Sequence, residues 1–95
     1  MYKKKALLEI ENFCKSVSSS HQWINEHLDK TQNCDVHVFV IFLSNMEKCR
    51  EEEDKIIRDN CKIEGIINLL QKCGCHSDII ERIQKQLIHD VIDFY

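Results

Sequence analysis

The sequence predicts an all-α fold, a compact antiparallel bundle of six helices that forms a single domain over residues 1–95. The chain has no proline and only two glycines, while leucine, isoleucine, glutamate and lysine are common. This composition favours helices and leaves hairpin turns without their usual residues. Apolar residues also recur at steps of three and four along several segments. A chain of this length has room for one core, so we expect no second domain.

Two amphipathic segments open the chain. Residues 4–17 place apolar side chains at helical spacing, with Leu8 alone on the charged face, which predicts a helix. Three serines at 18–20 then favour a turn and the start of a second helix. We expect that helix to precede a polar loop at 29–33 and to pack through Trp23, Ile24 and Leu28.

Residues 36–43 are the one ambiguous segment. Their β-branched and aromatic content is typical of a strand, but the chain offers no second strand to pair with this one. We therefore predict a helix that is capped by Asp35 and continues to Met46. Because it is apolar nearly all round, part of its surface should be exposed, at Val38, Val40 or Ile41.

The second half of the sequence predicts three helices. A short one at 49–59 has its acidic residues in the first turns and Ile56 and Ile57 toward the core. A central helix at 62–74, capped by Asn60 and ended by Gly74, is apolar over a wide arc and should touch several partners. The last helix, capped by Ser77, has one long apolar stripe, and outside that stripe lie Ile88 and Ile92.

The charge balance argues against two classes of partner. The net charge of -3 supplies no general attraction for nucleic acid or for an anionic membrane. Glu9 and Glu11 interrupt the apolar stretch that a signal peptide would need. No apolar run approaches the roughly 18 residues of a membrane span. We therefore expect a soluble, cytoplasmic protein that binds neither nucleic acid nor membrane.

The six cysteines allow three interpretations. An even number of cysteines is compatible with disulfides, but without a secretion signal reduced and mostly buried thiols are the expectation. A metal- or redox-responsive site is the alternative, although zinc sites usually space their cysteines more widely than this cluster does. The donors of such a site would be Cys61, Cys73, Cys75 and His76.

No catalytic constellation is recognisable. The five histidines are scattered along the chain, and neither a glycine-rich phosphate loop nor a nucleophile motif is present. The sequence therefore predicts a protein without enzymatic activity, cofactor or metal, whose function rests on surface contacts.

The order of the helical segments carries a family resemblance. An apolar segment at 35–43 is followed by an acid-rich segment at 50–59, a Leu-Leu segment closed by glycine at 66–74, and a segment with paired apolar positions at 78–87. In this order the chain resembles a caspase-recruitment domain of the death-fold superfamily. The resemblance implies a non-enzymatic signalling module in apoptosis or innate immunity, with a second copy or another death-fold domain as partner.

The resemblance also implies where the partner binds. Members of the family dock an acidic face on a basic one, and a head-to-tail contact of this kind builds filaments. The acidic candidates here are Glu51, Glu52, Glu53 and Asp54. The basic candidates lie near the two ends of the chain, at Lys3, Lys4, Lys5, Arg82 and Lys85.

Two further alternatives stay open. A bare domain without an effector region would suit a decoy or inhibitor. A dimeric helical bundle without a signalling role would use Ile88, Ile92 and the third helix as its interface.

Overall fold

The computed structural model describes residues 1–17, 24, 26 and 34–94. Four helices form within these ranges, and the described residues contain no strand. The predicted all-α class is confirmed, whereas the prediction of six helices is wrong, because within the described residues one helix at 55–72 replaces the two predicted over 49–59 and 62–74. The helices are α1 (Tyr2–Val17), α3 (Val36–Arg50), α4 (Lys55–Lys72) and α5 (Ser77–Phe94).

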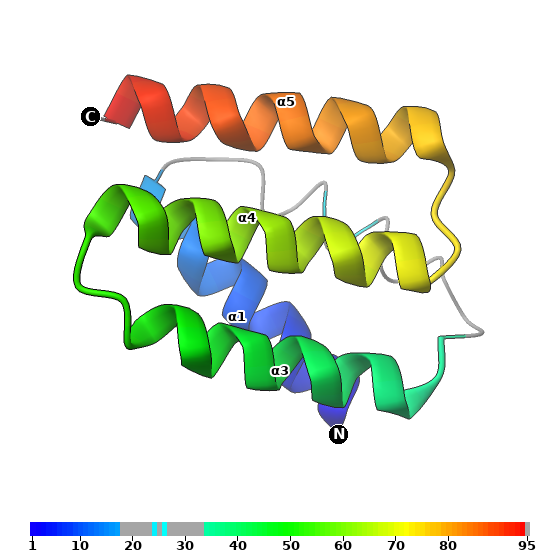
Figure 1. The fold of residues 1–95 in the computed structure, drawn as a ribbon. Helices are drawn as coiled ribbons and strands as arrows, with labels where there is room; N and C mark the ends of the chain where they lie inside the picture. Colours follow the sequence, from blue (N-terminus) through cyan, green and yellow to red (C-terminus); the bar gives the residue numbers. More distant parts are fainter. Residues whose placement is uncertain (18–23, 25, 27–33, 95) are drawn as a thin grey trace.

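The helix α4 lies at the centre of the arrangement. It packs against α3 on one side and α5 on the other, and successive helices run in opposite directions (Figure 1). The helix α1 crosses this layer and packs against α3 and α5. The broad apolar arc predicted for the central helix is therefore explained by two neighbouring helices.

One face of each helix packs into the core. Where the structure describes their side chains, the predicted periodic stripes of α1, α4 and α5 point inward, which confirms these sequence assignments. The residues with almost no exposed surface include Ile10 and Cys14 of α1, Phe42 of α3, Leu70 of α4, and Ile83 and Leu87 of α5.

The ambiguous apolar segment is a helix, as predicted. The Asp35 carboxylate accepts the His37 N–H at 3.2 Å, and α3 runs four residues past Met46 to Arg50. Val40 and Ile41 stay 40% and 43% exposed, so the expected unburied apolar surface is present.

The predicted helix at 49–59 does not form. Arg50 ends α3, residues 51–54 make the connecting loop, and α4 begins at Lys55 and passes through Asn60 without a break. The true cap is Asp54, whose carboxylate accepts the N–H groups of Ile56 at 2.9 Å and Ile57 at 3.1 Å. The Asp54 carboxylate satisfies two backbone N–H donors of the first turn. It therefore stabilises a helix start at Lys55 more than Asn60 stabilises one six residues further on.

The core positions predicted for Ile56 and Ile57 are also wrong. These side chains are 58% and 54% exposed, because they lie in the first turn of α4, before the first buried position at Asp59.

The link between α4 and α5 follows the prediction in part. Gly74 has a φ of 78°, and the Cys75 N–H reaches back to the Leu70 carbonyl at 3.1 Å, the pattern by which a left-handed residue ends a helix. Ser77 is the first helical residue instead of the cap, and the Asp78 N–H donates to Nδ1 of His76 at 3.3 Å.

Most of the predicted second helix lies outside the described residues. This holds for the serines at 18–20, for Trp23 and Leu28, and for the loop at 29–33. Within the predicted segment the structure describes Ile24, which is fully buried in the core, and Glu26, which is exposed.

Two disulfides link the α3 and α4 segments, one between the helices themselves and one between the residues that flank them, so the expectation of reduced thiols is wrong for four of the six cysteines. Cys49 pairs with Cys61 near one end of the helix pair, and Cys34 pairs with Cys73 at the other. Their Cα atoms are 5.8 Å and 4.8 Å apart, within the range that a disulfide spans. The antiparallel packing brings together cysteines that lie 12 and 39 residues apart in the sequence.

Candidate functional site

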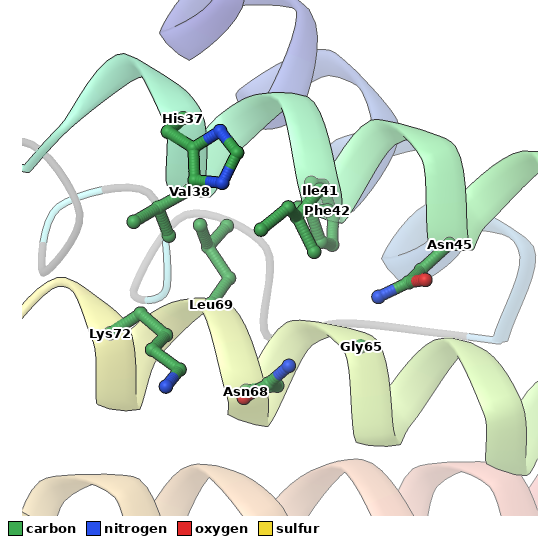
Figure 2. Close-up of a pocket in the computed structure, with 9 residues that line it drawn as sticks. All are labelled: His37, Val38, Ile41, Phe42, Asn45, Gly65, Asn68, Leu69 and Lys72. Carbon is green, nitrogen blue, oxygen red and sulfur yellow. The ribbon is translucent and has the colours of Figure 1, made fainter.

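An apolar groove lies between α3 and α4. Val38, Ile41 and Phe42 of α3 form one side, and Leu69 of α4 lies opposite them (Figure 2). The groove encloses about 180 Å³. At the groove the apolar segment of α3 meets the broad apolar arc of α4, and part of this apolar surface stays exposed, as at Ile41.

Polar side chains surround this groove. His37 and Asn45 come from α3, and Asn68 and Lys72 come from α4 (Figure 2). The described lining contains amide, imidazole and ammonium groups but no carboxylate. An apolar floor with a polar rim is the usual composition of a surface that binds another protein.

Gly65 explains how the two helices approach each other beside the groove. A Cβ atom at this position would lie 2.5 Å from Cε of Met46, so the absence of a side chain lets Met46 pack against the α4 backbone. Met46 is buried, and the face of α3 that carries it is thereby fixed in the core. Ile41 is left at the surface of the same helix.

The size of the groove limits what it can bind. Pockets for small molecules and cofactors usually enclose about 300–1,000 Å³. At about 180 Å³ this groove is smaller, and it suits one or two apolar side chains that a partner inserts.

A second exposed apolar surface lies on α5. Ile88 is 41% exposed and Ile92 is 66% exposed, one turn further along the helix. Both lie outside the buried stripe, as predicted, and we call them the isoleucine pair. A helix with an apolar pair at this spacing is typical of segments that bind into apolar grooves.

The predicted acidic site residues form the α3–α4 loop. Glu51, Glu53 and Asp54 are exposed, while Glu52 is half-buried and its carboxylate accepts the Asp54 N–H at 3.3 Å. Part of this cluster therefore stabilises the loop and caps α4. Glu51 and Glu53 are the exposed members that take no part in these loop and cap contacts.

The predicted basic site residues lie on other elements. Lys3, Lys4 and Lys5 belong to the first turns of α1, where Lys3 is half-buried and the other two are exposed. Arg82 and Lys85 are exposed on α5, and Nζ of Lys85 lies 3.8 Å from the Glu81 carboxylate. The structure thus distributes the basic candidates over two helices, and a docking role for them stays a prediction.

The proposed Cys/His cluster loses two of its four donors. Cys61 and Cys73 are disulfide-bonded, and a thiolate is needed to bind metal. The described residues hold no group of three or more metal-binding side chains. Two cysteines of the chain are free, Cys14 in the core and Cys75 at the end of α4.

The groove was only partly predictable. The exposure of Ile41 and of the isoleucine pair followed from helical spacing, but the register of α3 against α4 did not.

None of the helices that the structure describes combines the length and apolarity needed to cross a membrane. Comparisons with protein-family models, with curated proteins and with solved structures found no match.

Proposed function

We propose that this protein is a non-enzymatic interaction module that self-associates head to tail. The groove between α3 and α4 of one copy receives the isoleucine pair of the next copy. The observation that carries this proposal is the open apolar groove, with Ile41 43% exposed at its edge.

The chain itself supplies a matching occupant. Ile88 and Ile92 project from one side of α5 at the four-residue spacing of helix-in-groove recognition. The same contact, repeated from copy to copy, would cover both the groove and the isoleucine pair. Fully burying an exposed isoleucine side chain contributes roughly 1.5–3 kcal/mol. Ile88 and Ile92 are 41% and 66% exposed, so each gains a part of that amount on docking.

The charges around the two surfaces are also compatible. The groove carries Lys72 and no carboxylate, while Glu81 and Lys85 both lie on the side of α5 that carries the isoleucine pair, with Nζ of Lys85 3.8 Å from the Glu81 carboxylate. Docking would let Lys72 replace Lys85 as the partner of Glu81. Opposite charges at the rim favour the correct orientation and the association rate more than the affinity.

Self-association agrees with the expectation from the caspase-recruitment resemblance, but it does not depend on that family assignment. A groove that takes an isoleucine pair from a different death-fold protein would be the recruitment alternative. The decoy alternative requires a chain that stays monomeric and binds one partner.

The two disulfides favour an oxidising compartment as the place of action. Disulfides persist in such compartments and are rare in the cytosol. This proposal replaces the cytoplasmic location expected from the sequence.

Light scattering coupled to size exclusion, over a range of protein concentrations, tests the proposal. The wild-type protein should grow with concentration, and Ile92→Ser and Ile41→Ser should each abolish that growth. Ile57→Ser is the matched control, because Ile57 is similarly exposed but belongs to neither surface. Thermal unfolding checks that every variant is folded.

Mixing the two defective variants makes the test sharper. Ile41→Ser retains the isoleucine pair and Ile92→Ser retains the groove, so an equimolar mixture should form a dimer and nothing larger. A wild-type protein that stays monomeric at all concentrations, or growth that survives in both variants, would contradict the proposal.

A further inference from the structure

A second cavity, of about 280 Å³, lies between the carboxyl end of α1 and the first turns of α4. Four basic side chains line it. Arg50 comes from the end of α3, and the spacing of Lys55, Arg58 and Lys62 places these three on one side of α4. Four cations around one cavity are unusual on a chain whose net charge is -3.

Two of these side chains are held in place by neighbouring groups. The Arg58 guanidinium donates to the Glu52 carbonyl at 3.5 Å, and Nζ of Lys62 lies 5.7 Å from the centre of the Phe13 ring. Both are half-buried, so their orientation is already partly fixed before any ligand arrives.

Two carboxylates balance the cluster in part. Asp59 lines the same cavity and is 4% exposed, and Glu9 forms an ion pair with Arg50. Among the described residues that line the cavity, four cations stand against one carboxylate, while Glu9 and the acidic loop at 51–54, which joins Arg50 to Lys55, are close neighbours of the cluster.

The pKa of Lys62 responds first to burial and then to the charges of both signs around it. Burial lowers the pKa of Lys62, and repulsion from Arg58 and Arg50 lowers it further, although Asp59 and Glu9 act in the opposite direction. A bound anion would relieve this repulsion and raise the pKa of Lys62.

We propose that the cavity bounded by Arg50, Lys55, Arg58 and Lys62 binds a phosphate- or sulfate-bearing anion. A guanidinium presents a planar fork of donors that matches two oxygens of a tetrahedral oxyanion, and an ammonium adds a point charge. A cavity just below the size range of small-molecule sites suits one such group with its immediate substituent. Pyrophosphate and a sulfated sugar carry the same chemistry from two different sources.

A purely structural role for the cations is the competing explanation. Ser16 and Val17, the last residues of α1, also line the cavity, and basic groups near a helix carboxyl end offset its dipole. Such a role would make the cations important for stability and leave the affinity for anions unchanged.

Isothermal titration at constant ionic strength distinguishes these explanations, with pyrophosphate and a heparin-derived disaccharide as separate probes. The Ile92→Ser background keeps self-association out of the measurement. Arg58→Gln and Lys62→Gln should each weaken binding about tenfold, since one charge-assisted hydrogen bond contributes roughly that factor. Lys48→Gln, which removes the same charge from an exposed position outside the cavity, should leave the affinity unchanged.

Glu9→Gln provides an opposite test. It removes the carboxylate that competes for Arg50, so it should tighten binding. Binding of either probe with this pattern of variants supports the proposal, and the preferred probe identifies the source of the anion. No binding of either probe, an equal loss in Lys48→Gln, or a lowered unfolding temperature of Arg58→Gln with unchanged affinity would overturn it.

Discussion

Burial controls the chemistry of Cys14. Its side chain has no exposed surface, and burial raises the thiol pKa to about 12, with a further contribution from the Asp90 carboxylate. Because the thiolate is the reactive form, this cysteine should not react with alkylating reagents in the folded protein. Cys75 is half-buried, and burial also raises its pKa, but it is the more accessible of the two free thiols.

The raised pKa of Cys14 predicts a pH dependence of stability. The unfolded thiol loses its proton near its ordinary pKa of 9.0, while the folded thiol keeps it up to about 12. The contribution of Cys14 is therefore fully present below pH 9.0 and is lost as the pH rises toward the folded value, by about 1.4 kcal/mol per pH unit. Urea unfolding of the wild type and of Cys14→Ala, at a series of pH values, measures this loss.

The variant serves as its own control, because it retains every other titrating group. The stability difference between wild type and Cys14→Ala should shrink as the pH rises above 9.0. A difference that stays constant to about pH 11 would contradict a strongly raised pKa.

Local sequence patterns predict most of the helix faces and one helix end. The stripes of α1 and α5 are local patterns, so spacing alone predicts core positions such as Ile10 and Leu87, which have no exposed surface. The end of α4 at Gly74 was also predictable, because a left-handed residue there needs glycine.

The misplaced helix boundary has a physical cause. Both Asp54 and Asn60 can cap a helix. The sequence alone does not indicate which of them precedes the first helical turn, where backbone N–H groups lack partners within the helix. One helix at Lys55–Lys72 places Lys55, Arg58 and Lys62 on one side, but the cavity also needs Arg50 and the carboxyl end of α1, which only the packing of the helices brings there. Disulfide pairing was harder to predict, because Cys34 meets Cys73 only through the antiparallel packing of two helices.

Each disulfide should contribute to stability according to the loop it closes. In the chain-entropy model, the separation of 39 residues between Cys34 and Cys73 corresponds to about 4 kcal/mol. The separation of 12 residues between Cys49 and Cys61 corresponds to about 3 kcal/mol. Urea unfolding of the two paired Cys→Ser variants should show both losses, with the larger one for Cys34 and Cys73.

Reduction of the wild type is the matching control for this prediction. A reductant should lower the wild-type stability below that of either paired variant under oxidising conditions. A wild type whose unfolding midpoint is the same with and without reductant would contradict the stabilising role.

The whole molecule separates its charged surfaces from its apolar ones. The acidic loop, the basic cavity and the α3–α4 groove involve different residues, so contacts through each can be removed independently. The charge-docking hypothesis requires the acidic loop for assembly, whereas the groove proposal requires Ile41 and Ile92.

Reversing the exposed loop charges distinguishes these two mechanisms. Glu51→Lys together with Glu53→Lys leaves the Asp54 cap and the Glu52 contact in place. Under the groove proposal this variant should still assemble, with an affinity changed by a few-fold, because exposed ion pairs contribute only about 0–1 kcal/mol each. Light scattering at low and high salt measures the effect, and complete loss of assembly would favour charge docking.

The two disulfides also bear on how the molecule would survive proteolysis. The exposed loop at 51–54 lies between the half-cystines of both bridges, so a single cut there would break the backbone but leave the pieces covalently attached at two places. The clipped protein should migrate as one species on a denaturing gel without reductant and as two with it. Since the core contacts of α3 and α4 do not depend on the loop backbone, such a two-chain form would keep the groove between them.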